Sequence, residues 1–338
     1  MSQSDNRSKR LLRSLLGPTM LAVPGAVAQA ANNVASGFVR KALVETPGVS
    51  PLQSMLAALL IAFLATAVVT LILQKAYQGS PREFSWHLPS KSTMAWHQLR
   101  LAIGLTATVL IFAASQEAFK TGNPPVAMVT VLSSTGAIYL AVNDLRKYHR
   151  YDGVALVVAQ VGLTAMGFAG ILIASWQSIA SIRGFGWPIL AAAIAGFLLG
   201  CLQLVQSKLV KECQEPAVKV VGYFAFQASV IAAFGFVIAS QQSGVWPRVN
   251  TELVVAAAAL GLCYAASQVL LQLANGFGVP SIVGVLVYLG IPTGFGLDFG
   301  LFGKVPSSDQ VVGSAVIFVA AIGIKLLEGQ LTARRTQI

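Results

Sequence analysis

Apolar residues in this chain fall into long runs of about 20, separated by short connections rich in glycine, proline, serine and charge. A helical run of that length spans the hydrocarbon core of a bilayer. The pattern predicts ten such helices, at about 15–39, 51–75, 96–117, 124–143, 152–175, 186–207, 217–240, 251–274, 279–302 and 309–328. No connection is long enough for a soluble domain, so we expect an all-α polytopic membrane protein.

The first run has two interpretations. A basic start, an apolar stretch and Ala28-Gln29-Ala30 together resemble a cleavable signal peptide. The alternative is an uncleaved first helix that continues through "VASGFVRKAL", residues 34–43. We favour the helix, because the arrangement of ten spans needs it.

Composition and charge agree with a membrane location. The chain is 55% hydrophobic and 10% charged, whereas soluble domains carry about 25% charged residues. If the N-terminus is cytoplasmic, 17 of the 23 Lys and Arg residues fall on the cytoplasmic side and 6 on the other. This bias predicts that both termini are cytoplasmic and leaves no basic residue inside a span. The net charge of +11 then reflects topology, and we expect no nucleic-acid partner.

Residues that would support catalysis or bind a cofactor are sparse. The three histidines (His87, His97 and His149) lie in or beside predicted charged loops, and the three cysteines are far apart. Neither set has metal-ligand spacing, and the chain has no phosphate-binding P-loop or catalytic triad. We therefore expect no metal, no cofactor and no enzymatic activity.

Two segments resemble each other across the chain. In "NDLRKYHRYDGVALVVAQVGL" and "FGKVPSSDQVVGSAVIFVAAIGI" a polar turn leads to a glycine, Gly153 or Gly313, that is predicted to open an apolar helix. Asp144 and Lys304 precede these glycines by nine residues. The first junction is predicted to be cytoplasmic and the second external, so a five-helix repeat must return inverted. We expect one repeat over residues 1–184 and the second over 185–338.

At these junctions the chain resembles the EamA-like branch of the drug/metabolite transporter superfamily. That family often has a glutamate where Asp144 and Lys304 stand. The segments "EAFKTGNPPVAMVTVLSS", "NNVASGFVRKALVETPGVSPLQSMLAA" and "LANGFGVPSIVGVLVYLGIPTGFGLDF" resemble other parts of its pattern. Two departures are Lys304 in place of an acid and the lack of a central proline in helix four. The resemblance implies two inverted five-helix repeats, alternating access, and a central cavity lined by helices one, three, four, six, eight and nine.

Polar side chains inside predicted spans are the candidate site residues. Helix eight carries a stripe of Tyr264, Gln268, Gln272 and Asn275, and helix one carries Gln29, Asn32, Asn33 and Ser36. We expect both stripes to line the cavity, and hydrogen bonding between helices is the alternative. On helix nine, Tyr288 is predicted to contact the substrate and Pro292 to allow a kink.

Two carboxylates are candidate coupling or gate residues. Asp298 and Glu117 lie near the predicted external ends of helices nine and three. The alternative for both is an interfacial ion pair, with Lys304 and Lys120 respectively.

The function predicted from the sequence is secondary transport. The substrate would be a small polar or amphipathic organic metabolite, such as an amino acid, exported across the cell inner (plasma) membrane, with protons as a candidate coupling ion. A nucleotide-sugar or sugar-phosphate exchanger of the same superfamily is an alternative, and the absence of basic residues inside the predicted spans argues against it. A membrane enzyme acting on a lipid-linked substrate is another alternative. Its only candidate site is the segment 143–152, which is interpreted more simply as a positively charged cytoplasmic loop.

Overall fold

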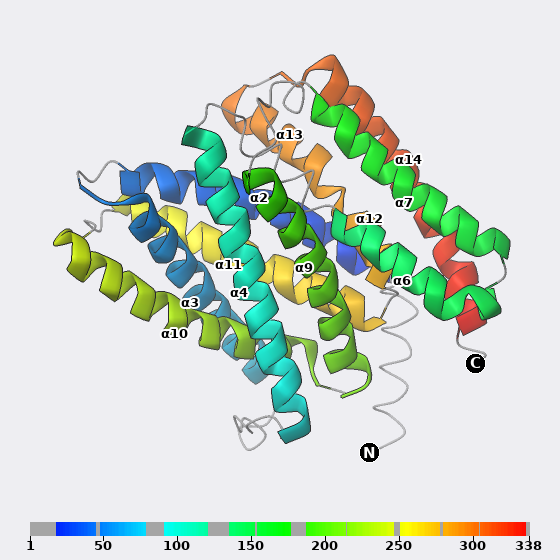
Figure 1. Cartoon of the computed structure of the whole chain (residues 1–338), viewed down its shortest axis with the longest axis horizontal. Helices are drawn as coiled ribbons and strands as arrows, with labels where there is room; N and C mark the ends of the chain where they lie inside the picture. Colours follow the sequence, from blue (N-terminus) through cyan, green and yellow to red (C-terminus); the bar gives the residue numbers. More distant parts are fainter. Residues whose placement is uncertain are drawn as a thin grey trace.

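The computed structural model describes residues 18–44, 48–78, 91–120, 135–152, 154–176, 187–213, 215–246, 251–277, 280–303 and 305–335. Within these ranges the secondary structure is helical, with no strand (Figure 1). The helices are α2 (Pro18–Val44), α3 (Pro51–Gln78), α4 (Lys91–Lys120), α6 (Thr135–Asp152), α7 (Val154–Ala174), α9 (Trp187–Lys211), α10 (Ala217–Ser243), α11 (Thr251–Phe277), α12 (Pro280–Val287), α13 (Gly290–Phe302) and α14 (Ser308–Arg335).

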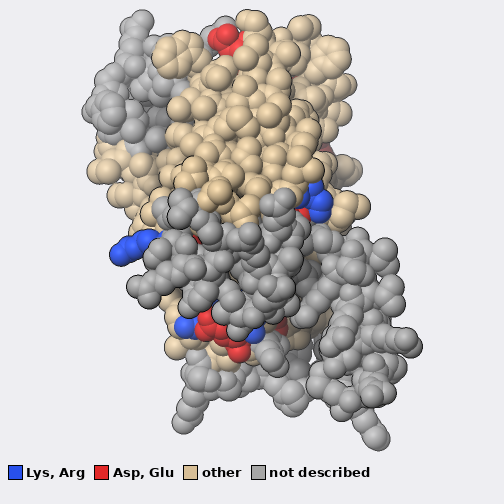
Figure 2. Space-filling view, turned by 90° about the vertical axis from the view of Figure 1, so that its right-hand side faces the viewer, with Lys and Arg blue, Asp and Glu red and all other residues tan. Residues whose placement is uncertain are grey.

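Eight stretches of this described part are long and apolar enough to cross a bilayer. They are Leu52–Gln74, Thr93–Ile111, Ala155–Ala174, Leu190–Lys211, Ala217–Ser243, Thr251–Gly276, Pro280–Leu301 and Ser308–Glu328. Large apolar side chains are exposed along them, and Figure 2 shows that the described part of the upper surface is almost entirely tan, with one acidic group at the top. The chain is therefore a multi-pass membrane protein. Of the ten predicted spans, those corresponding to α2 and α6 are not among the eight.

The helices pack mainly as pairs that join the two halves of the chain. Helix α2 runs along α11, α3 along α10, α4 along α9, and α7 along α14 (Figure 1). Helix α12 packs against both α2 and α6. Each of these contacts joins a helix before residue 184 to one after it, so the core lies between the halves and not within each.

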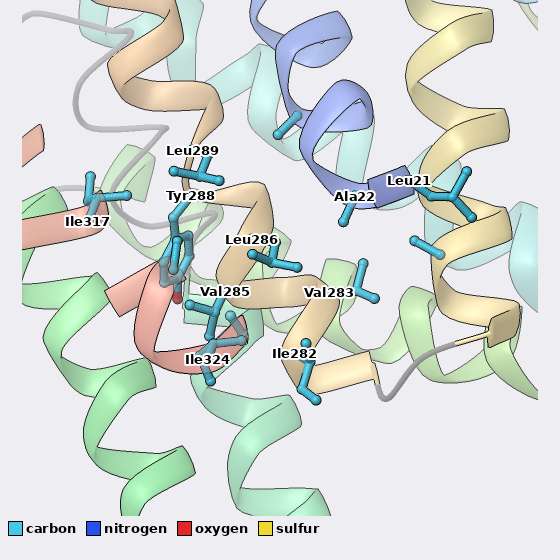
Figure 3. Close-up of a cluster of buried hydrophobic side chains, with 14 of the residues drawn as sticks. Leu21, Ala22, Ile282, Val283, Val285, Leu286, Tyr288, Leu289, Ile317 and Ile324 are labelled. Carbon is cyan, nitrogen blue, oxygen red and sulfur yellow. The ribbon is translucent and has the colours of Figure 1, made fainter. Parts of the chain in front are cut away.

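The largest buried apolar cluster surrounds α12. Every residue of that helix from Pro280 to Leu286 is buried. Side chains from α2, α6, α7, α11 and α14 pack around it, including Leu21, Ala137 and Ile317 (Figure 3). A helix that is buried along nearly its whole length and enclosed by others has no face left for lipid or water.

The structure corrects the predicted helix four and its loop. The prediction placed this helix at 124–143, followed by a cytoplasmic loop over residues 143–152. In the structure α6 continues through that segment to Asp152, and α7 begins at Val154. Gly153, predicted to open the next helix, lies outside the described residues. Its counterpart Gly313 lies inside α14, which begins at Ser308.

The predicted helix nine is two helices. The prediction gave one span over 279–302, with a kink at Pro292, and the structure breaks it into α12 and α13 at Tyr288 and Leu289. Proline has no N–H to donate to the carbonyl four residues earlier. That carbonyl, on Tyr288, instead accepts from the Ile291 N–H at 3.0 Å. Similar three-residue bonds close the turn before it, so the chain tightens there and changes direction.

Two helices begin with the same reciprocal cap. At α3, the Ser50 N–H donates to Gln53 Oε1 and the Gln53 N–H to Ser50 Oγ. At α14, Ser307 and Gln310 exchange the same two bonds. Gln53 does more than cap, because its Nε2 also donates to Ser243 Oγ and the Val245 carbonyl, both at 2.8 Å. It ties the start of α3 to the end of α10.

Gln53→Ala is expected to destabilise the protein more than Gln310→Ala. Both substitutions remove a cap, worth about 0.5–2 kcal/mol. Only Gln53→Ala also removes the part-buried bonds to Ser243 and Val245 and a buried bond to Ser240 of α10, each worth about 1 kcal/mol. Thermal unfolding of the two purified variants measures the difference, with Gln310→Ala as the matched control. Equal melting temperatures would show that the bonds to α10 contribute nothing.

Candidate functional site

The predicted stripe on helix eight lies on α11 and is largely buried. Gln272 and Asn275 are each 1% exposed, and Tyr264 and Gln268 are half-buried. The Gln272 Nε2 donates to the Gln206 carbonyl of α9 at 3.0 Å. In the described structure the side-chain oxygens of Gln272 and Asn275 have no hydrogen-bond partner. The stripe therefore combines one interhelical bond with two buried acceptors that have no partner among the described residues.

The stripe on helix one lies on α2, opposite α11. Ser267 of α11 donates to Gln29 Oε1 at 2.8 Å, which is the interhelical bonding given as the alternative. Asn32 is buried, and its Oδ1 has no partner among the described residues. The side chain of Asn33 lies outside the described residues. Both stripes thus meet in the α2–α11 pair, and a role of either in substrate binding stays a prediction.

The remaining predicted site residues lie apart from these stripes. Tyr288 is 3% exposed and lies in the apolar cluster around α12, with Ile317 and Ile324 of α14 nearby (Figure 3). Its ring packs over Gly167 of α7. Asp298 is half-buried on α13. Its proposed partner Lys304, and the side chain of Glu117 on α4, lie outside the described residues.

Arg100 is a buried cation that the sequence interpretation missed. It was counted among cytoplasmic basic residues, and the prediction that no basic residue lies inside a span is wrong. Arg100 lies within the membrane-spanning stretch Thr93–Ile111 and is 1% exposed. Helix α4 begins at Lys91 and not at 96, which puts Arg100 nine residues into the helix. At 1.5 Å per residue it lies about 13 Å from the helix start.

The guanidinium of Arg100 is held by α10. Its Nη1 donates to the Val220 carbonyl at 2.9 Å, and its Cζ lies 4.4 Å from the centre of the Phe224 ring. Among the described residues no carboxylate forms an ion pair with it, and Nε has no hydrogen-bond partner. Phe63 of α3 meets the rings of both Phe224 and Tyr264 of α11 edge to face, so Tyr264 belongs to the same aromatic cluster.

No carboxylate of the described residues helps to offset the cost of burying Arg100. Removing an ion from water costs several kcal/mol even after the protein relaxes. A hydrogen bond to a charged group returns about 1.5–3 kcal/mol, and a desolvated cation–π contact returns about 2 kcal/mol. Charged residues kept inside membrane spans at such a cost are usually functional. The Nε of the guanidinium remains a donor without a partner among the described residues.

His97 lies one turn before Arg100. The sequence analysis placed it in or beside a charged loop, and in the structure it is 2% exposed on α4. Its ring meets that of Tyr223 edge to face, with centroids 4.9 Å apart. Its Nε2 has no hydrogen-bond partner in the part of the chain that the structure describes. Together with Arg100 it gives α4 a polar face directed at α10.

A second buried charge lies on α6. Asp144 is 4% exposed and accepts a hydrogen bond from the Ser281 hydroxyl of α12. That hydroxyl in turn accepts from Gln160 Nε2 of α7. The sequence interpretation placed Asp144 in a loop. The three residues instead form a chain of bonds through three helices, linking the halves of the protein.

Longer predicted helices, extended as α4 and α6 are in the structure, would have placed Arg100 and Asp144 away from the helix ends. Arg100 and Asp144 each lie within one or two turns of a predicted helix end, where a charge is expected to reach the interface. The sequence signal that could have found Arg100 is its spacing of three from His97 and four from Gly104. These residues share a helical face, and a face combining ionisable groups with a glycine is unlike a face exposed to lipid.

Comparison with known proteins supports the fold. No protein-family model matches the chain, and no curated protein sequence matches it significantly. A solved structure described as "Crystal structure of protein" superposes with a TM-score of 0.68 at 18% sequence identity. The match covers 93% of this chain and 98% of that one. At this identity the likeness shows a shared fold over nearly the whole length, and nothing about substrate.

Proposed function

We propose that the protein is a secondary transporter of the EamA-like branch of the drug/metabolite transporter superfamily. Its substrate is a small polar or amphipathic organic metabolite such as an amino acid. It works by alternating access in the cell inner membrane, as an exporter with both termini cytoplasmic, and protons are the candidate coupling ion.

The pairing of helices is the observation that carries this proposal. Suppose that the five helices of the first half correspond, in order, to those of the second half. Then α2 corresponds to α9, α3 to α10, α4 to α11, α6 to α12–α13, and α7 to α14. The pair α2–α11 then becomes α9–α4, which is also a major contact in the structure. The pairs α3–α10, α6–α12 and α7–α14 each become themselves. Two five-helix repeats related by a two-fold axis would give this pattern, with a boundary near residue 184. Such repeats are a common build of secondary transporters.

Hydrogen bonds between polar groups join the two halves of the chain, whose relative motion alternating access requires. Ser267 bonds to Gln29, Ser281 to Asp144, and Arg100 to the Val220 carbonyl. Each bond joins a residue before 184 to one after it. Rocking of one half against the other would break and remake such bonds and would open buried polar groups to each side in turn. The break between α12 and α13 fits the same scheme, because discontinuous helices are typical of transporter sites.

Uptake by reconstituted protein tests the proposal. Proteoliposomes should accumulate at least one member of a panel of radiolabelled amino acids, sugar phosphates and nucleotides by counterflow, above protein-free liposomes. Gln268→Ala, which changes a half-buried amide of the α11 stripe, is expected to slow that uptake several-fold at normal expression. Turnover of a lipid-linked substrate without movement of any solute would contradict transport and favour the membrane enzyme.

A further inference from the structure

We infer that Arg100 and Tyr264 form the anion-binding part of the substrate site, so the carried molecule bears a carboxylate or a phosphate. The inference deepens the proposed transport function and rests on it. It also removes the sequence argument against phosphorylated substrates, which depended on there being no basic residue inside a span.

Aromatic rings fix the position of the guanidinium. Phe63 of α3 meets both Phe224 and Tyr264 edge to face, with ring centroids 5.7 and 5.6 Å apart. Arg100 stacks over Phe224, and Phe63 connects that ring to Tyr264 on α11. The cation is thereby held between α4 and α10, beside an aromatic cluster that reaches α11, where a side chain on a flexible stem would otherwise move freely. A cation held in this way needs little reorganisation to bind an anion.

Unpaired polar atoms accumulate on the helices around Arg100. On α4, α9, α10 and α11, six described residues carry a buried side-chain nitrogen or oxygen without a hydrogen-bond partner: His97, Arg100, Gln203, Gln227, Gln272 and Asn275. Leaving such atoms unpaired is costly away from water. A substrate with one anionic group and a polar body would pair several of them at once.

The charge balance selects an anion over a cation. A guanidinium stays protonated at any pH that the protein meets, and its planar fork of donors matches carboxylate and phosphate oxygens. Glu215 is an acid that lies just before α10, the helix that holds the guanidinium. Glu215 is already bonded to Lys219 at 2.9 Å. No described acid neutralises Arg100, so a cationic substrate would be repelled and an anionic one would supply the missing counter-ion.

Matched probes on the wild-type protein test the inference directly. Full-length protein in nanodiscs is heated with each standard amino acid and with its carboxamide, which lacks the carboxylate. Glycerol 3-phosphate and uridine monophosphate are compared with glycerol and uridine. We expect a concentration-dependent rise in melting temperature with at least one anionic probe and none with its uncharged-end partner, because a ligand stabilises the state that it binds.

Variants then assign the effect to the residue. Arg100→Gln is expected to weaken the apparent affinity for the active probe by about 30-fold or more. Arg100→Lys, which keeps the charge but not the fork, should weaken it less. Tyr264→Phe removes one hydroxyl and covers the case in which Arg100→Gln does not fold. Arg146→Gln, on an exposed arginine of α6, is the matched control and should bind like the wild type.

The outcomes separate this inference from the proposed function. Equal stabilisation by the uncharged-end partners overturns the anion site, as does an unchanged affinity in folded Arg100→Gln or a wild type that responds to no anionic probe. Counterflow of neutral or cationic solutes alone would support the transport function and contradict the anion site. Anion binding that depends on Arg100, with no solute moved in proteoliposomes, would support the anion site and contradict the transport function.

Discussion

Gly313→Ala is expected to lower the stability of the protein strongly, by about 1–3 kcal/mol or more. A Cβ at this position would lie 2.4 Å from the Ala174 nitrogen and 2.5 Å from the Gly170 carbonyl oxygen, both on α7. These are backbone atoms and cannot turn aside, so α14 must move away from α7. Because α7 and α14 form one of the major helix pairs, thermal unfolding in detergent should show a clear drop in melting temperature.

Gly294→Ala is the matched control for Gly313→Ala. It lies inside α13, and a Cβ there would have nothing within 4 Å. Since alanine favours a helix over glycine by about 1 kcal/mol, this variant should melt at the wild-type temperature or slightly above it. A Gly313→Ala protein that melts with the control would show that α7 and α14 are not held at this distance.

Asp144→Ala is expected to have the second large effect. The substitution leaves the buried Ser281 hydroxyl without its acceptor and interrupts the bonds that run from α6 through α12 to α7. An unsatisfied buried group costs about 1–3 kcal/mol, and more where a charge took part. The melting temperature should fall, and under the proposed function counterflow by the reconstituted variant should fall with it.

Two further variants separate the carboxylate's role as an acceptor from its charge. Asp144→Asn keeps an oxygen that can accept from Ser281 and should recover most of the stability. Asp309→Ala removes an aspartate from the first turn of α14, where a helix-end charge contributes about 0.3–1 kcal/mol. If Asp144→Ala costs no more than Asp309→Ala, the network between α6 and α12 does not hold the halves together.

The course of the helices could be predicted from sequence because lipid leaves the backbone few choices. A chain in hydrocarbon must satisfy its own N–H and C=O groups, so long apolar runs become helices whatever surrounds them. The predicted runs at 51–75, 186–207 and 217–240 correspond to α3, α9 and α10 in this way. The effect of Pro292 was equally readable, since the missing donor acts within its own helix.

Helix ends were less predictable, because the requirement to pair backbone groups within lipid does not determine where a helix stops. The helical segment 143–152 is strongly charged and reads as a loop, yet it continues α6. Its place is decided by partners far away in sequence, chiefly Ser281 on α12, 137 residues from Asp144. The capping residues Ser50 and Gln53 were visible in the sequence, but the attachment of Gln53 to α10 was not.

The sequence by itself determined that this chain spans a membrane and roughly where, because hydropathy is a property of each segment alone. Only the tertiary structure decided which polar residues are buried together and which helices face each other. Arg100 and Tyr264 are 164 positions apart, and no local pattern relates them. They belong to one cluster because α4 and α11 both pack on α10, and burial turns an ordinary arginine near a helix start into a cation without a counter-ion among the described residues. The physical reason is that the cost of a charge depends on what surrounds it, which only the fold supplies.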